Sequence, residues 1–418
     1  MDIAPAKYPR DFLACGLHIG IKPNGVLDFG AVHSLAPCSA WALFTRNNFP
    51  GAPVIVGREI IGDGKLQTVI VNSGNSNVAT GEAGLRLVRE YCALAAENLG
   101  VAPEMILPSS TGVIGRRLPA DPMKSVCGAL KSHLKEGDFP SFSRAIMTTD
   151  TAPKYNAQEL ASGVRLYGTA KGAGMIQPDM ATMLAYVFTD AVMDSSDIQR
   201  LLRCVADRTF NRVSIDSDTS TSDTLALLAN GASGKRIRFS EAAERAYRDM
   251  DFPLERELGE LADLDEDSRE FTRVLGDICL DLTRRIAREG EGSSRLIELR
   301  VTEARDREQA LKIGRAVINS PLFKTAVRGA DPNWGRIVMA AGKVFDEPLS
   351  LESFRIFFGS LEMQLGETDP EQLRLFSEYL ANPEVMIRLS LGTGEAEERL
   401  WGCDLTEEYV KINAYYTT

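Results

Sequence analysis

The chain has 418 residues, 44% of them hydrophobic, which is enough apolar material for two domains or one large α/β body. Its 47 Lys and Arg residues against 58 Asp and Glu residues give a formal net charge of −11. This balance excludes the broad basic surface that binds nucleic acid. The composition therefore favours a protein that acts on small molecules.

The cysteines and the N-terminal sequence indicate in which cellular compartment the protein acts. The seven cysteines are scattered along the chain and form no C-x-x-C pair, so we expect neither a disulfide framework nor a metal site. The first residues lack the apolar segment of a signal peptide, and no stretch approaches the ~20 apolar residues of a membrane span. We therefore expect a cytoplasmic protein with no membrane segment.

The first third of the chain alternates short apolar runs with turn residues. The runs "APVIVGREII" (52–61) and "LQTVIVNSGNSN" (66–77) both end near turn-forming residues, which predicts two strands. Between Gly81 and Gly100, apolar residues recur near a 3.6-residue period with a glycine at either end. This pattern predicts a helix.

The same alternation continues to the C-terminus. Ser195 or Ser196 is a candidate N-cap for a helix whose apolar residues are Ile198, Leu201, Leu202 and Val205. Residues 240–289 read as mostly charged helix, and "RLIELRVTEA" (295–304) alternates as a half-buried strand does. Interleaved strands and helices predict the α/β class.

Most common catalytic signatures are absent. The sequence contains no G-x-S-x-G elbow, no H-E-x-x-H motif, no phosphate-binding P-loop and no G-x-G-x-x-G between a strand and a helix. Its histidines, His18, His33 and His133, stand in no recognisable catalytic context. A catalytic device, if present, must therefore work without a histidine base or a bound metal.

The stretch "AKGAGMIQPDMATMLAYVFTDA" (170–191) places a glycine-rich loop before a threonine and a strand. A threonine hydroxyl can act as a nucleophile when its own α-amine, freed by cleavage of the preceding bond, serves as the base. Glycines that permit strained backbone and the small Ala181 would suit cleavage before Thr182. The alternative from the residues alone is a plain glycine-rich turn that enters a strand.

A second stretch, "LPSSTGVIGRRLP" (107–119), offers hydrogen-bond donors in what reads as a compact loop. Acyl transfer requires preorganised donors for the oxyanion that develops at the attacked carbonyl. The Thr111 hydroxyl and the Gly112 amide are candidates. The alternative is a β-turn that follows a strand.

These stretches together resemble the ornithine acetyltransferase family, also called glutamate N-acetyltransferases, whose members cut themselves at an Ala-Thr bond. The resemblance covers nearly the whole chain in family order. The matching stretches are "FTRN" (44–47), "VNSGNSN" (71–77), "PSSTGVIG" (108–115), "IMTTDTAPK" (146–154), "KGAGMIQPDMATML" (171–184), "SIDSDTSTSDT" (214–224), "REGEGSSRLIE" (288–298), "GADPNWGRI" (329–337) and "YVKINAYYTT" (409–418).

The resemblance implies a role for individual residues. Thr182 would be the nucleophile that carries the acetyl group, with Thr111 and Gly112 as the oxyanion hole. The residues that fall where the family binds substrate are Thr148, Thr149, Lys171, Thr182, Glu291, Asn413 and Thr418. This set suits an amino acid, because a lysine can pair with a carboxylate and Glu291 can pair with an α-ammonium or relay a proton.

The resemblance also implies an assembly and a reaction. The α/β fold would contain mixed sheets with covering helices, cut into intertwined chains of residues 1–181 and 182–418 that associate as a dimer of heterodimers. N-acetyl-L-ornithine would acylate Thr182, ornithine would leave, and L-glutamate would accept the acetyl group. We expect no cofactor, although the family includes members that also use acetyl-CoA as a donor.

Some positions depart from the usual family letters. Asp179, three residues before Thr182, replaces a usual asparagine or serine, and Ser217 and Ser222 replace a usual glycine and asparagine. These departures leave the acyl acceptor open. The alternatives are a hydrolase that uses the same threonine and gives the acyl group to water, an acyltransferase of specialised metabolism with another acceptor, and a binding protein that has lost the chemistry.

Overall fold

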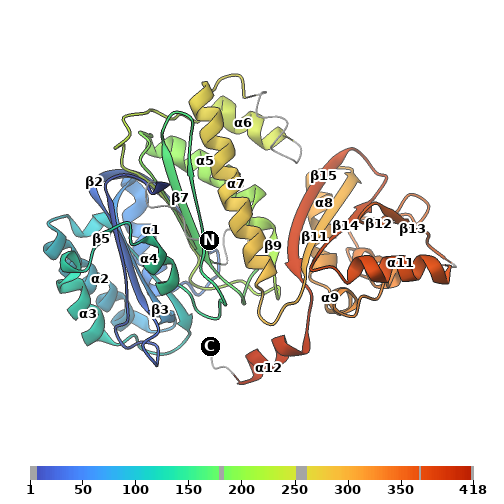
Figure 1. Cartoon of the computed structure of the whole chain (residues 1–418), viewed down its shortest axis with the longest axis horizontal. Helices are drawn as coiled ribbons and strands as arrows, with labels where there is room; N and C mark the ends of the chain where they lie inside the picture. Colours follow the sequence, from blue (N-terminus) through green and yellow to red (C-terminus); the bar gives the residue numbers. More distant parts are fainter. Residues whose placement is uncertain (1–6, 178–182, 251–260, 367–368, 416–418) are drawn as a thin grey trace.

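The computed structural model describes residues 7–177, 183–250, 261–366 and 369–415. Figure 1 shows two bodies: a larger one that contains the N-terminal half, and a smaller one built around β11, β12 and β14, with helix α12 leaving the smaller body near the gap between them. The predicted cut at Ala181 and Thr182, and the C-terminal Thr418, lie outside the described residues.

The elements alternate as the α/β class requires. The strands are β1 (Phe12–Leu17), β2 (Phe29–Phe44), β3 (Lys65–Asn75), β4 (Ile106–Val113), β5 (Lys135–Glu136), β6 (Lys154–Glu159), β7 (Arg165–Lys171), β8 (Leu184–Thr189), β9 (Val213–Ser214), β10 (Thr224–Ala229), β11 (Leu296–Ala304), β12 (Arg355–Phe358), β13 (Leu361–Met363), β14 (Glu384–Ser390) and β15 (Ala396–Cys403). The α-helices are α1 (Ala52–Ile60), α2 (Gly81–Leu99), α3 (Ala120–Gly128), α4 (Phe139–Ala145), α5 (Ser195–Arg208), α6 (Glu241–Asp249), α7 (Glu266–Arg288), α8 (Arg307–Ile318), α9 (Pro321–Arg328), α10 (Trp334–Gly342), α11 (Pro370–Leu380) and α12 (Glu407–Tyr415).

The larger body is organised around a mixed sheet with the order β4-β3-β2-β10-β8-β7-β6, and β1 pairs with β2 and β5. The long strand β2 joins the two halves of this sheet. Its first residues pair with β1 on one side and β3 on the other, and its last six residues, 39–44, pair with β10. Parallel pairs occur at β3–β4 and at β10–β8, so the sheet is mixed, as expected.

The two chains that the sequence predicts would share this sheet. Strand β8 follows the predicted cut and lies between β7, which precedes the cut, and β10. Strand β10 in turn pairs with β2 from the N-terminal part. Residues on either side of position 181 therefore form one continuous sheet and one hydrophobic core.

Helices cover both faces of the large sheet. Helices α5 and α7 contribute residues such as Ile198, Leu201 and Ile278 to a core with β7, β8 and β10. The contact with α7 is close, because a Cβ added at Gly168 in β7 would lie 2.4 Å from Cγ2 of Ile278. Helices α2 and α3 form a second core with β1, β3 and the start of β2 (Figure 1).

The smaller body is built on the sheet β13-β12-β14-β11-β15-β9, against which α8, α9, α10 and α11 pack. Strand β9 comes from the segment between α5 and β10, and it pairs with Trp401 and Gly402 of β15. This pairing links the second sheet to the segment that runs from α5 to β10 of the larger body.

Several expected elements are confirmed. The helix between Gly81 and Gly100 is α2, and it ends at Gly100, whose φ of 74° is in the left-handed region that closes a helix. The four apolar residues expected in α5 are all buried, although the N-cap is Asp194 rather than Ser195 or Ser196. Strand β11 buries Ile297, Leu299 and Val301 as its alternation predicts.

The strand expected over 52–61 is wrong, because Ala52–Ile60 forms helix α1. A proline occupies the first turn, where its fixed φ and missing N–H suit a helix start. The buried residues Val54 and Val56 fit a short apolar run in either structure, so periodicity alone does not separate the two. In the folded chain α1 lies against β2 and β4, because a Cβ added at Gly57 would be 2.8 Å from the Phe44 ring and 3.2 Å from Cδ1 of Leu107.

Two further observations concern cysteines and membranes. The cysteines of the described part are free and buried. Among the described helices, none combines the length and the apolar character that crossing a membrane requires.

Candidate active site

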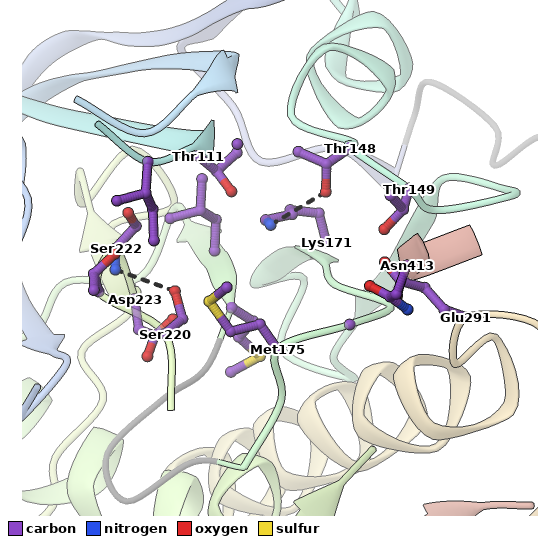
Figure 2. A pocket seen from close by; sticks show the side chains of 16 residues that line it. Thr111, Thr148, Thr149, Lys171, Met175, Ser220, Ser222, Asp223, Glu291 and Asn413 are labelled. Carbon is purple, nitrogen blue, oxygen red and sulfur yellow. Dashed lines mark hydrogen bonds between the residues drawn. The ribbon is translucent and has the colours of Figure 1, made fainter. Parts of the chain in front are cut away.

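One pocket with a volume of about 90 Å³, open to solvent at its mouth, gathers residues from widely separated parts of the sequence (Figure 2). It lies where β4, β7, β8 and β10 begin or end. It is lined by Thr111, Gly112, Ile114, Thr148, Thr149, Lys171, Gly174, Met175, Met183, Leu184, Ser220, Thr221, Ser222, Asp223, Glu291 and Asn413. Every described residue that the sequence predicts for the site is among them.

Lys171 supplies the cation of the pocket. It is the last residue of β7, where it pairs with Leu184 at the start of β8, and its Nζ donates to Oγ1 of Thr148 over 3.4 Å. Burial lowers the pKa of Lys171, and the charge of the nearby Asp150 carboxylate opposes that effect. The lysine is therefore partly desolvated, which strengthens its attraction for an anionic substrate group.

Thr148 and Thr149 are positioned by a buried ion pair behind them. Asp150 accepts from Nζ of Lys154 at 2.8 Å, from the Thr148 amide at 3.0 Å and from the Gly172 amide at 2.7 Å. Burial alone would raise the pKa of Asp150, but Lys154, Lys171 and these hydrogen bonds outweigh it and lower the pKa. An ionised Asp150 thus ties the threonine loop to the end of β7.

Thr111 and Gly112 belong to the end of β4, not to the compact loop that the sequence suggested. They pair with Ser73 and Gly74 of β3. Gly112 has a φ of 128°, and a Cβ there would lie 2.4 Å from the carbonyl carbon of Gly74. Only glycine fits this close approach, which brings the residue to the pocket wall.

Glu291 and Asn413 form the opposite side of the pocket. Glu291 follows α7, is 8% exposed, and donates its amide to the Ala173 carbonyl at 2.8 Å. The side-chain amide of Asn413 donates to Oε2 of Glu291 at 2.8 Å. Gly174 lies against this carboxyl, because an added Cβ would be 2.5 Å from its Cδ. Without a family match, Asn413 would read as a turn residue, but it lies on helix α12.

The loop that leads to the predicted cut leaves regular structure after Lys171. Gly172 has a φ of 153°, and Met175 has a φ of 54°, which is uncommon for a residue with a side chain. Asp216 accepts from the Met175 amide at 2.6 Å and from the Ile176 amide at 2.8 Å, which holds this backbone in place. The backbone is therefore strained at Met175, whereas the Ala181–Thr182 bond, where the sequence predicts strain, lies outside the described residues.

The segment Ser220–Asp223, which forms the wall beside β8, is not among the site residues that the sequence predicts. It lies in the stretch "SIDSDTSTSDT", which entered the family resemblance without a role for any of its residues. Its run of short hydroxyl and carboxyl side chains before an apolar strand was the available signal. Such a run is equally common in solvated turns, so its position in the pocket could not be read from the sequence.

Comparisons with known proteins match the chain along its whole length. The ArgJ family model matches residues 13–418. The chain is 42% identical over 411 residues to an arginine biosynthesis bifunctional protein ArgJ of Clostridium acetobutylicum, with 98% of each chain covered. It is 41% identical over 424 residues to a glutamate N-acetyltransferase of Streptomyces clavuligerus, with 100% of each chain covered.

The chain belongs to the ArgJ family, the ornithine acetyltransferases. Among solved structures, an ArgJ protein of Bacillus halodurans is 33% identical and matches 56% of this chain and 100% of its own, with a TM-score of 0.48. As an ArgJ family member, the chain has the mixed-sheet α/β fold described above, with the pocket at the ends of β4 and β7.

Proposed function

We propose that this ArgJ family protein transfers an acetyl group from N-acetyl-L-ornithine to L-glutamate. The observation that carries the proposal is the pocket itself. It combines one cation at Lys171, a carboxyl at Glu291 and neutral donors at Thr111 and Gly112, close to the start of β8. The two charged side chains can bind a small zwitterionic substrate, and the neutral donors can stabilise an oxyanion. The relatives named for arginine biosynthesis and for glutamate N-acetyltransferase support the same reaction.

The nucleophile in this proposal is Thr182, exposed by self-cleavage after Ala181. The cut would produce chains of residues 1–181 and 182–418 that stay together, because β7 and β8 are neighbours in one sheet. An α-amine ordinarily has a pKa of ~7.8, so the one freed by the cut can take the hydroxyl proton near neutral pH. Met183, the first described residue after the cut, lines the pocket, which supports a nucleophile at this place.

In this proposal some of the remaining residues bind the substrates and others stabilise the transition state. The Thr111 hydroxyl and the Gly112 amide donate to the oxyanion. Lys171 pairs with the carboxylate of either amino acid, and Glu291, held by Asn413, pairs with its ammonium or relays a proton. Thr148, Thr149 and the C-terminal Thr418 complete the set of substrate contacts.

We infer further that the cleaved protein is cytoplasmic and forms a dimer of heterodimers, and that it needs no cofactor. Whether acetyl-CoA is a second donor is decided by its ability to acetylate the protein. A relative named as bifunctional supports testing this substrate.

One experiment tests the transfer. Purified protein is given N-acetylornithine with and without glutamate, and both amino-acid products are measured. We expect ornithine release to depend on glutamate after the first turnover, with one N-acetylglutamate formed for each ornithine. Steady release of ornithine and acetate without glutamate would instead identify a hydrolase.

A further inference from the structure

Asp223 is a buried carboxyl of the pocket to which the proposed function gives no role. Its side chain is 1% exposed, and its Oδ2 atom has no hydrogen-bond partner in the described part of the chain. The Oγ atom of the preceding Ser222 is also buried, and none of the described residues forms a hydrogen bond with it. Both residues line the pocket. Buried polar atoms are rarely left unpaired, and those that remain so often serve a ligand or a reaction.

The position of Asp223 relates it to the reacting centre. It comes directly before β10, and the amide of the next residue, Thr224, donates to the carbonyl of Met183 at 3.0 Å. Thr224 and Lys171 both pair with Leu184, from the two sides of β8. Asp223 and Lys171 therefore flank the beginning of β8. Figure 2 shows Asp223 on the Ser222 side of the pocket, with Lys171 between it and Glu291.

The surroundings of Asp223 favour its protonated form. Burial raises its pKa well above the ordinary value, and the opposing effects of the Ser220 and Thr45 hydroxyls, the Lys171 charge and the Met183 amide are too weak to reverse this. A carboxyl that keeps its proton near neutral pH can act as a general acid. Glu291 differs, because its Oε2 already accepts a hydrogen bond from Asn413.

We propose that Asp223 is the catalytic acid and base that exchanges a proton with the reacting amine of the substrate. This inference rests on the proposed function. In the first half-reaction the nucleophilic oxygen bonds to the acetyl carbon and the amide C–N bond breaks. The Asp223 carboxyl gives its proton to the departing nitrogen, while the hydroxyl proton of the nucleophile passes to the α-amine of the same residue.

The second half-reaction restores each proton. The amine of glutamate forms the new C–N bond to the acetyl carbon and gives one proton to the Asp223 carboxylate. The ester C–O bond breaks, and the nucleophilic oxygen takes its proton back from the α-ammonium. After both halves, Asp223 is again protonated and ready for the next N-acetylornithine.

The test uses two acetyl donors that differ in what their leaving group needs. The leaving amine of N-acetylornithine needs a proton, whereas the phenolate of p-nitrophenyl acetate does not. In Asp223→Asn protein, acetylation of the 182–418 chain is followed by intact mass. The rate is divided by the fraction of the protein that has been cleaved. We expect acetylation by N-acetylornithine to fall ~10²-fold or more while acetylation by the ester stays close to wild type. Asp218→Asn, the same change in an exposed residue of the same segment, is the matched control and should leave both rates unchanged.

If the rate of acetylation by both donors fell equally in Asp223→Asn, Asp223 would only support the fold. An unchanged rate of acetylation by N-acetylornithine would also overturn the inference. If the variant is never cut, the wild-type protein decides. The ratio of amide to ester acetylation should fall as the pH rises, because only the amide needs the acid form of Asp223. Lys171, Glu291 and the Asp150–Lys154 pair behind Lys171 face the same region. Both donors are therefore used at saturating concentration, where substrate binding by these residues does not limit the rate of acetylation.

A ratio that is constant with pH would overturn the inference. Failure of the proposed function looks different, because wild-type protein would then not be acetylated by N-acetylornithine at any pH.

Discussion

Asn413 of helix α12 donates a 2.8 Å hydrogen bond to the carboxyl of Glu291, which follows helix α7. The two residues are 122 positions apart in the sequence. Helix α12 has no buried residue of its own, and Thr406, just before it, anchors it by donating to the Gly292 carbonyl. Helix α12 therefore places the Asn413 side chain in the pocket although it buries none of its own side chains.

The first prediction concerns this pair. Asn413→Leu keeps a side chain of similar size but removes the donor to Glu291, so the carboxyl is left without its partner. Because the pair holds the substrate rather than the oxyanion, we expect KM to rise about tenfold with a smaller change in kcat. Steady-state kinetics with both amino acids would measure this, and an unchanged KM would show that Asn413 does not position Glu291.

The second prediction is self-cleavage between Ala181 and Thr182. Denaturing electrophoresis of active protein should show two fragments, and N-terminal sequencing of the larger should begin Thr-Met-Leu-Ala. Thr182→Ala should stay uncut and inactive, whereas Thr182→Ser could be processed slowly because it keeps the hydroxyl. A single full-length band from active wild-type protein would contradict the prediction.

The third prediction addresses the end of β4. Thr111→Ala removes a hydroxyl that would donate to the oxyanion, so we expect kcat to fall ~10²-fold with little change in substrate binding, a loss of ~3 kcal/mol of transition-state stabilisation. Thr111→Ser is the matched control, since it keeps the hydroxyl and should retain most of the activity. If the kcat of Thr111→Ala matched that of the wild type, Thr111 would have only a structural role in β4.

The fourth prediction concerns Lys171 and the two half-reactions. A lysine that pairs with the carboxylate common to both amino acids should matter equally to ornithine and to glutamate. Lys171→Met should therefore slow acetylation by N-acetylornithine and transfer to glutamate alike, and double-reciprocal plots for the wild type should be parallel. Loss of only one half-reaction would contradict a shared site.

The fifth prediction tests the ion pair behind the threonine loop. The lowered pKa of Asp150 means that its ionised form stabilises the fold at pH values above the ordinary 3.8, and that this contribution is lost as the pH falls through the lowered value. Asp150→Asn leaves the buried Lys154 paired, among the described residues, with Glu289 alone, whose carboxyl lies 3.0 Å from its Nζ, and we expect a loss of ~2 kcal/mol in unfolding free energy at pH 7. Thermal unfolding should show this difference shrinking at strongly acidic pH, and a difference that stays constant would contradict the assignment.

The sequence by itself determined the class of the fold, several of its elements and most of the residues expected in the pocket. Apolar periodicity predicts α2, α5, β8 and β11 because each of these elements buries one regular face or, for β8, every residue. The motifs predict Thr111, Lys171 and Glu291 as neighbours because they match a family along the whole chain. Over 52–61, however, the apolar run fits a helix and a strand equally well.

The tertiary structure decided what depends on distant contacts. That β4 continues through Gly112 follows from its pairing with Gly74, and that Asn413 reaches Glu291 follows from the anchoring of α12 at Gly292. Asp223 gives the clearest contrast. Its letters resemble those of any polar turn, and only the packing of β10 against β8 removes it from water beside Lys171, because burial is a property of the assembled sheet and not of the local sequence.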